Sequence, residues 1–357
     1  MSNEVKKDIS AETSTDVTEE ISELGKTPEW QALLDEEAIL RITDLRVQYR
    51  TERATAHAIN GLDLVIHKGE SMGLVGETGA GKTTTALSTL NLLPRDIAFI
   101  EGGSIEFDGK NVQRMSDTEL RDMRGSKISM IFQNPLTALN PVFSVGEQIA
   151  MVLRVHQKLN RKQATVRAGE LLEMVGIAGH RVKDYPFQFS GGMRQRVGIA
   201  AALACNPQLL IADEPTTALD VTIQAQILEL MRKLQDQYDT SLLMITHNLG
   251  IIAELCQQVA VMYAGRIIEY GSVDSVFSAP QHPYTLGLLG ALPALEGPRE
   301  RLSAIPGTIA SSQHLPVGCA FHPRCTLCSE KCQTDQPRMS HVGNGHFVAC
   351  FMREGGQ

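Results

Sequence analysis

The feature that most constrains the fold is a glycine-rich turn between an apolar strand and a helix. The turn reads Gly76-Glu77-Thr78-Gly79-Ala80-Gly81-Lys82-Thr83, after Ser71–Val75 and before a helix expected over Thr83–Leu93. Glycines let backbone N–H groups turn inward around an anion, and the N-terminus of the next helix adds its dipole. The turn therefore predicts a phosphate site. In it, Lys82 reaches the β- and γ-phosphates of a nucleotide and the Thr83 hydroxyl ligates Mg²⁺.

Short apolar segments alternate with helical ones around this turn. Besides Ser71–Val75, buried strands are expected at Leu209–Ala212 and Ser241–Ile245, with the helix Val221–Gln237 between them. The alternation predicts an α/β fold with a mostly parallel sheet. A helical unit inserted before the strand at Leu209 is expected to contain the helices Ser144–His156, Arg161–Val175 and Gly191–Ala204.

Charge is concentrated at the N-terminus. Residues 1–37 contain 11 of the 41 acidic residues and three of the 33 basic residues, and residues 38–357 are balanced. A neutral body disfavours a broad nucleic-acid-binding face, so no nucleic-acid partner is expected. We expect residues 1–37 to form a flexible acidic tail with a short helix around Pro28–Glu37. In that helix, Trp30 packs on the domain edge or anchors a partner.

Hydrophobic segments give no sign of a membrane span. The longest clean uncharged stretch, Val197–Ala212, is interrupted by Asn206-Pro207-Gln208, and a spanning helix needs roughly 20 apolar residues. The N-terminus also lacks the apolar segment of a secretory signal. We therefore expect the chain to stay in the cytoplasm. Cysteines serve there as thiols or metal ligands rather than as disulfides.

Two acids, Asp213 and Glu214, directly follow the strand Leu209–Ala212. The carboxyl ends of the strands are where open α/β sheets bind ligands. Taken alone, the two carboxylates would also suit a helix N-terminus. Beside a phosphate loop, they predict that Asp213 holds Mg²⁺, directly or through water. Glu214 is then expected to orient or deprotonate the attacking water.

Three further motifs follow in a characteristic order. Gln133 follows the apolar strand Ile128–Phe132, Ser190-Gly191-Gly192-Met193-Arg194-Gln195 precedes the strand at Leu209, and His247 ends the strand Ser241–Thr246. With these motifs, residues 39–285 resemble the ATP-binding cassette (ABC) family. The resemblance implies a P-loop NTPase fold whose RecA-like core carries an antiparallel β subdomain and a helical subdomain. We expect the cassette over residues 38–285, with the helical subdomain at about 134–205.

The same resemblance implies roles for individual residues. Tyr49 matches the aromatic side chain that stacks on adenine, and Gln133 matches a glutamine that reaches both Mg²⁺ and the membrane partner. Ser190, Gly191 and Gly192 belong to a signature that contacts the ATP held by the opposite subunit, so two cassettes would sandwich two ATP molecules. Asp220 matches an aspartate of the same interface, and His247 matches a histidine that contacts the γ-phosphate. The expected catalytic residues are Lys82, Gln133, Glu214 and His247, and the expected nucleotide-binding loop runs from Gly76 through Thr83 to Thr84.

Two segments, Asn134–Pro141 and Gln281–Thr285, resemble the ATPases of bacterial oligopeptide and dipeptide importers, a branch that includes nickel and glutathione importers. This implies a peripheral ATPase at the cytoplasmic face of the inner membrane. Its partners would be two permease subunits, a second ATPase and, indirectly, an external substrate-binding protein. Ser190–Met193 resembles the first ATPase of a heterodimeric pair. The alternatives are an ABC ATPase without a permease, or a regulatory module without catalysis, which Glu214 and His247 disfavour.

Five of the seven cysteines lie between Cys319 and Cys350. In the importer branch, a similar C-terminal extension, here residues 286–357, binds a 4Fe–4S cluster through four cysteines. Four thiolates could replace a missing hydrophobic core by ligation. The additional Cys328 creates a Cys-x2-Cys spacing that is also common in zinc sites. A 4Fe–4S cluster, zinc and free thiols therefore stay open, with the expected cluster ligands Cys319, Cys325, Cys332 and Cys350.

Overall fold

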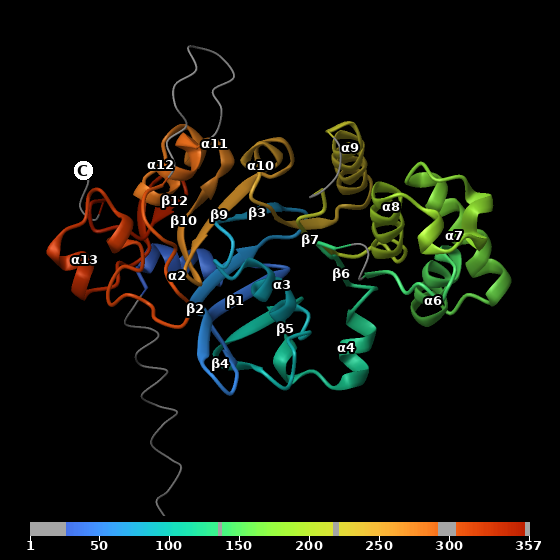
Figure 1. The fold of residues 1–357 in the computed structure, drawn as a ribbon, viewed down its shortest axis with the longest axis horizontal. Coiled ribbons are helices and arrows are strands. Elements are labelled where there is room, and N and C mark those ends of the chain that lie inside the picture. The colour runs from blue at the N-terminus through green and yellow to red at the C-terminus, as the bar shows by residue number, and fades with distance from the viewer. Residues whose placement is uncertain (1–25, 135–137, 217–220, 292–304, 354–357) are drawn as a thin grey trace, which may run out of the picture.

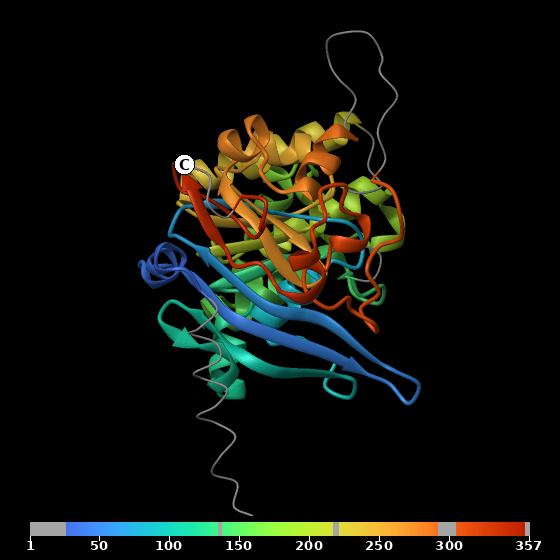
Figure 2. The ribbon, with the colours of Figure 1, turned by 90° about the vertical axis from the view of Figure 1, so that its left-hand side faces the viewer.

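The strands of the protein form two sheets that lie one above the other (Figures 1 and 2). A computed structural model describes residues 26–134, 138–216, 221–291 and 305–353. Within these residues the strands are Leu40–Arg50 (β1), Thr55–Ile66 (β2), Ser71–Val75 (β3), Ala98–Phe107 (β4), Lys110–Asn111 (β5), Ile128–Ile131 (β6), Leu209–Asp213 (β7), Ser241–Ile245 (β8), Gln258–Tyr263 (β9), Arg266–Ser272 (β10), Ser340–Gly343 (β11) and His346–Val348 (β12).

The larger sheet has the strand order β11-β12-β10-β9-β3-β8-β7-β6. The strands from β9 to β6 are parallel, and β10, β12 and β11 are added to the β9 edge in antiparallel fashion. Along β7, Leu209 and Ile211 face one apolar cluster and Leu210 and Ala212 face the other. Both faces of the sheet are therefore covered, which explains why these strands read as continuous apolar runs. The predicted α/β class is confirmed.

The smaller sheet is antiparallel, with the order β2-β1-β4-β5. The sequence suggested two strands at Ile39–Ile42 and Leu45–Tyr49. The structure has one strand with a register shift between Ile42 and Leu45, where Asp44 has a positive φ of 44°. Apolar side chains of this sheet, including Leu40, pack against the β3–β7–β8 face of the larger sheet in one buried cluster.

Helices cover the sheets and form a separate group at one end of the molecule (Figure 1). Two of the helix starts in that group are capped by Ser144 and Asn160, whose side chains accept bonds from backbone N–H groups three residues on. The α-helices are Pro28–Asp35 (α2), Lys82–Thr89 (α3), Asp117–Met123 (α4), Val145–Gln157 (α6), Arg161–Met174 (α7), Gly191–Ala202 (α8), Val221–Tyr238 (α9), Leu249–Leu255 (α10), Val273–Ser278 (α11), Pro283–Gly290 (α12) and Glu330–Thr334 (α13).

The helix after the phosphate loop is shorter than the expected segment Thr83–Leu93. It ends at Thr89, and Asn91 then adopts a left-handed conformation with φ of 50°. The backbone N–H of Leu92 donates to the carbonyl of Leu87, which closes the helix end. None of the helices in the described parts of the chain is both long and apolar enough to cross a membrane.

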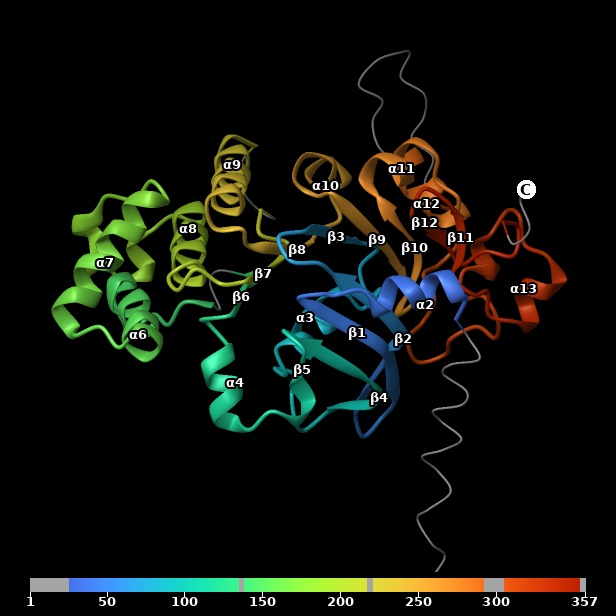
Figure 3. The same cartoon turned by 180° about the vertical axis from the view of Figure 1, so that it is seen from behind.

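The N-terminal boundary differs from the expected one, because residues 26–37 belong to the folded body. Helix α2 lies against β2 and β11 (Figure 3), and Trp30 is only 1% exposed. The Trp30 ring packs edge-on against Tyr270 at 5.4 Å and Phe347 at 5.1 Å, and its Nε1 donates to Asp63. Trp30 is therefore a core residue of this chain.

The C-terminal region was expected as a small extension after residue 285, but it continues the larger sheet. Strand β12 pairs with β10 through Glu269↔Val348 and Tyr270↔Phe347, and β11 then pairs with β12. Figure 1 places the cysteine-containing segment with α13 at the end opposite to α6 and α7. The sequence missed this arrangement because a three-residue strand carries too little pattern to be recognised.

Candidate functional site: a nucleotide cavity beside the phosphate loop

The phosphate loop begins where the buried strand β3 ends and leads directly into α3. Gly81, the N-cap of this helix, has a φ of 108°, and a Cβ there would lie 2.6 Å from the carbonyl oxygen of Ala58. The strained conformation and the close approach both require glycine. The loop is thus held against β2 with the N-terminus of α3 open toward the cavity described below.

Lys82 lies inside this loop with 7% of its surface exposed. Its Nζ donates to the carbonyl oxygens of Gly76 at 2.7 Å and Glu77 at 3.1 Å. Burial lowers the pKa of Lys82, and the negative charges of Glu214, Asp213 and Glu77 oppose that change. The carbonyl oxygens hold the ammonium group where an anion in the loop would meet it.

Asp213 ends β7 with only 2% of its surface exposed. Burial raises the pKa of Asp213, and a hydrogen bond from Thr83 lowers it in part. The Oδ1 atom is buried and accepts no hydrogen bond from protein groups. A buried carboxylate oxygen without a partner is costly, and together with a hydroxyl oxygen it forms the hard oxygen donor set that Mg²⁺ prefers. These residues therefore fit the expected metal.

The Glu214 carboxylate contacts the side chains of two further predicted residues. Its Oε2 accepts a hydrogen bond of 2.8 Å from Nε2 of Gln133, and its Oε1 lies 3.2 Å from Nδ1 of His247. The three residues follow β6, β7 and β8, which are neighbouring parallel strands. Glu214 itself has a φ of 46°, a strained conformation for a side chain of this kind. Its backbone N–H donates to Ile245, which helps to hold it there.

Lys82, Gln133, Glu214 and His247 face one cavity of about 440 Å³, whereas Asp213 and Gly76 are not among its lining residues. The Tyr49 hydroxyl lies 3.4 Å from the Thr84 hydroxyl at this site. Three lining residues were not predicted: Ala56 and Ala58 on β2, and Ser312 from the C-terminal region. Ala56 and Ala58 alternate on their strand, a weak signal that could have been noticed; nothing local marks Ser312. The cavity is lined by Tyr49, Ala56, Ala58, Thr78, Gly79, Gly81, Lys82, Thr83, Thr84, Gln133, Glu214, His247 and Ser312.

Several predicted residues lie elsewhere. The Glu77 carboxylate is paired with Arg324, and Ala80 is buried in the apolar core. Ser190 is the N-cap of α8, where its Oγ accepts a bond from the backbone N–H of Met193. None of Ser190, Gly191 and Gly192 lines the cavity. Asp220 lies outside the residues that the structure describes.

The four predicted cluster cysteines line one small cavity, together with His282 and Phe321. Burial first, and the neighbouring thiols second, raise the pKa of Cys319 to about 11. Cys328 is exposed and is not part of this lining. Within the described residues, no group of three or more His, Cys, Asp or Glu side chains is placed to hold a metal ion. Both the iron–sulfur cluster and zinc therefore stay hypotheses.

Comparison with known proteins identifies two family regions. Residues 59–217 match the model of the ABC transporter family, and residues 268–332 match the C-terminal region of oligopeptide/dipeptide transporters. A putative peptide import ATP-binding protein of Brucella melitensis is 48% identical over 89% of this chain and 98% of its own. The oligopeptide transport ATP-binding protein AppD of Bacillus subtilis is 46% identical over 88% of this chain and 97% of its own.

A solved structure shares the architecture. The ATP-binding cassette MJ0796, in a dimeric post-hydrolysis state with ADP and Pi, matches with a TM-score of 0.59 at 26% identity. The match covers 66% of this chain and 98% of that one. The sequence relatives extend over nearly the whole of both chains, and the site described above contains the expected phosphate loop and acids. The chain therefore belongs to the ABC transporter family of ATP-binding proteins, in the group that carries the oligopeptide/dipeptide transporter C-terminal region.

Proposed function

We propose that this chain is the ATPase subunit of a bacterial ABC importer that takes up peptides through a separate membrane permease. The observation that carries the proposal is the convergence of Gln133 and His247 on Glu214, in the same cavity as Lys82. The match to the oligopeptide/dipeptide transporter C-terminal region supports a peptide substrate. Nickel, glutathione or another small solute is the alternative cargo.

Nucleotide binding uses the loop, the helix and one cation. Loop N–H groups and the N-terminus of α3 face the phosphates, and Lys82 exchanges its two carbonyl partners for phosphate oxygens. Thr83 and the unpaired Oδ1 of Asp213 would hold Mg²⁺, with Gln133 as a further ligand. When bound, Mg²⁺ supplies positive charge at the β- and γ-phosphate oxygens. Tyr49 stacks on the adenine.

Hydrolysis then depends on the position of Glu214. Its carboxylate orients the attacking water and accepts its proton. Before the nucleotide binds, Gln133 and His247 hold its two oxygens. His247 is 64% exposed at its side chain, so it can turn from Glu214 to the γ-phosphate when the nucleotide is present. The protein contributes chiefly position and charge, as phosphoryl transfer requires.

A second cassette completes the site in this proposal. Ser190 is exposed at the start of α8 and lies outside the cavity of its own chain. It is therefore available to contact the γ-phosphate in a partner cassette that meets this one head to tail. We assign the partner to a second, related ATPase, because Ser190–Met193 has the form of the first member of such a pair. Asp220 would act in the same interface.

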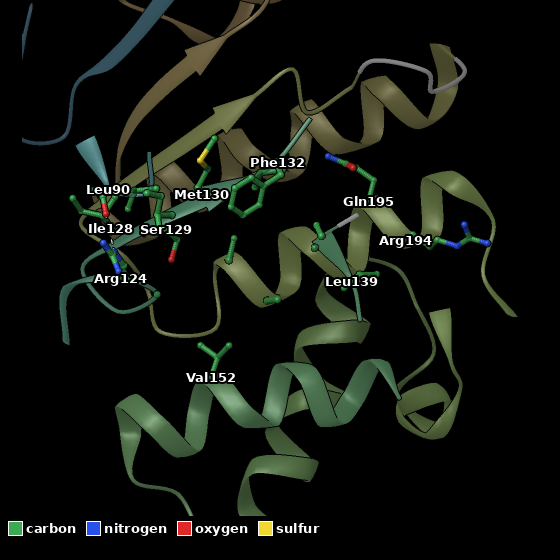
Figure 4. A pocket seen from close by; sticks show the side chains of 17 residues that line it. Leu90, Arg124, Ile128, Ser129, Met130, Phe132, Leu139, Val152, Arg194 and Gln195 are labelled. Atoms are coloured by element: carbon green, nitrogen blue, oxygen red, sulfur yellow. Dashed lines mark hydrogen bonds between the residues drawn. The ribbon is translucent and has the colours of Figure 1, made fainter. Parts of the chain in front are cut away.

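An apolar groove provides the permease contact. It has a volume of about 260 Å³ and lies between β6 and the helical group, and its lining residues include Met130, Phe132, Leu139, Val152 and Gln195 (Figure 4). Phe132 directly precedes Gln133, so the groove adjoins the catalytic residues. An apolar surface in a body of balanced charge suits a cytoplasmic helix of the permease rather than the lipid surface. Phe143 is exposed but does not line this groove.

This contact would place the protein at the cytoplasmic face of the inner membrane as a peripheral subunit. The test is to express the chain with its permease pair and second ATPase, then compare ATP turnover and uptake with those of the isolated chain. We expect a slow isolated chain, and co-purification of the permease. If the isolated chain is as fast as the complex, an ABC ATPase without a permease replaces this proposal.

For the cysteine segment we propose a 4Fe–4S cluster held by Cys319, Cys325, Cys332 and Cys350. The support is that all four line one cavity. Protein purified without oxygen should be brown, absorb at about 400 nm and contain about four irons per chain, and Cys319→Ser should remove the colour. One equivalent of zinc without iron would replace the cluster by a zinc site. Metal-free protein would leave four free thiols, of which those of Cys332 and Cys350 are buried.

A further inference from the structure

The C-terminal region reaches back to the phosphate loop through Arg324. Its Nη1 donates to Oε2 of Glu77 at 2.7 Å, and its Nη2 donates to Oε1 of the same residue at 3.1 Å. The Arg324 side chain is only 3% exposed. The Tyr284 hydroxyl also accepts a bond of 2.8 Å from the backbone N–H of Glu77. Both the backbone and the side chain of this loop residue are therefore held by segments more than 200 positions away.

Contacts other than that with Glu77 also hold the Arg324 side chain in place. Its Nε donates to the carbonyl of Pro306 at 3.0 Å, and its guanidinium lies 5.8 Å from the Phe321 ring and 5.9 Å from the Tyr263 ring. Gly307 allows the close passage, because a Cβ there would lie 3.1 Å from Cγ of Arg324 at a φ of +81°. The planar fork is thus presented to the carboxylate in one orientation, which favours a bidentate pair.

The pair matters because Glu77 belongs to the phosphate loop. The Glu77 charge acts on the nearby Lys82, whose ammonium also bonds to the Glu77 carbonyl. Without a partner, this carboxylate would repel a triphosphate and attract the lysine that should bind it. With Arg324 in place, the charge is neutralised and the side chain is directed out of the nucleotide cavity.

We propose that Arg324 is a positioning residue for ATP binding, which neutralises and orients Glu77 and so keeps the phosphate loop receptive to the triphosphate. The inference rests on the proposed ATP site around Lys82. A second contact supports the role of this region. Ser312 lines the nucleotide cavity, and its carbonyl accepts a bond of 2.7 Å from the backbone N–H of His57 on β2. The C-terminal region is therefore part of the nucleotide site as well as of the sheet.

The test measures the Kd of MgATP for the full chain by calorimetry. The variants are Arg324→Met and Arg324→Lys, each with and without Glu77→Gln. The control is Arg154→Met, which removes an arginine–glutamate pair of the same length, to Glu147, in the helical group. Unfolding without nucleotide is recorded for every variant. Arg324→Lys keeps the positive charge but cannot form the two parallel hydrogen bonds of the guanidinium, so it separates the effect of charge from that of geometry. It also provides the test if Arg324→Met does not fold.

We expect Arg324→Met to raise the Kd at least about tenfold, Arg324→Lys to raise it less, and Arg154→Met to change it by less than about twofold. In the Glu77→Gln background, Arg324→Met should raise the Kd of MgATP by less than about threefold, because no unpaired carboxylate is left in the loop. Equal losses in both backgrounds, or an unchanged Kd, would overturn the inference. If the original chain does not bind MgATP, the proposed ATP site itself is wrong and the inference falls with it.

Discussion

Glu214→Gln tests the centre of the proposed reaction with almost no change in shape. The amide oxygen can still accept the 2.8 Å hydrogen bond from Gln133. The exchange removes the negative charge and the ability to accept a proton, while Asp213, Lys82 and the loop stay in place. Loss of a general base costs about 10²–10⁴ in rate, which corresponds to about 3–5 kcal/mol of activation free energy.

The same exchange should leave ATP binding intact. Glu214 is, after burial, the strongest influence on the pKa of Lys82, and its charge raises that pKa. Removing the charge lowers the pKa further, but it also removes repulsion between Glu214 and the triphosphate. We therefore expect an unchanged or lower Kd for MgATP together with a turnover reduced at least a hundredfold.

The assay is steady-state phosphate release by the assembled transporter, with calorimetric MgATP binding measured in parallel. Gln133→Ala and His247→Ala serve as comparisons, since each removes one partner of Glu214 without removing the base. Both should reduce turnover less than Glu214→Gln does. A turnover of the Glu214→Gln transporter within a few fold of the original would refute the assignment of Glu214 as the group that activates water.

Three other predictions follow from the same structure. Trp30→Ala should lower the free energy of unfolding by about 3–5 kcal/mol, measured by denaturant titration, because its buried ring packs against two aromatic side chains; a loss below about 1 kcal/mol would contradict its place in the core. Leu92→Asp should abolish co-fractionation with permease-containing membranes while leaving MgATP affinity within about twofold, since the side chain is 39% exposed and lines the apolar groove but not the nucleotide cavity; retained membrane binding would exclude the groove. In metal-free protein, Cys319 should stay largely unalkylated by iodoacetamide between pH 7 and pH 9, because burial raises its pKa to about 11 and the reactive thiolate forms only as the pH approaches that value. The exposed Cys328 should react first in peptide mass mapping, and the reverse order would contradict the partial burial of Cys319.

The local sequence was sufficient to predict a structural element wherever the residues that define it lie close together in the chain. The strands Ser71–Val75 and Ser241–Ile245 have the bounds that their apolar runs predicted. The phosphate loop could be recognised because its glycines, its lysine and the helix start lie within eight residues. Glu214 could be assigned because ligands bind at the carboxyl ends of the strands in such sheets and a phosphate loop lies in the same chain. Gln133 and His247 could be assigned only through the order of motifs that resembles the ABC family.

Contacts between distant segments could not be read in this way. The tail predicted over residues 1–37 extended too far, since the burial of Trp30 depends on Tyr270 and Phe347, which follow it by more than 200 residues. The C-terminal strands were missed because pairing along a buried edge stabilises them, and their own pattern is too short to reveal it. The hydrophobic periodicity of a segment indicates which of its side chains are buried, but not which other segment packs over them.

The amino-acid sequence by itself determined the phosphate loop, the acids at the strand ends and the α/β class, because each depends on residues close together in the chain or on a simple property of parallel sheets. Only the tertiary structure decided that the C-terminal region belongs to the nucleotide site. The Arg324–Glu77 pair joins residues 247 positions apart, and the Arg324 side chain reaches the loop where it also bonds to the Tyr263 hydroxyl at the end of β9. No local pattern around either residue specifies the path of the chain between them.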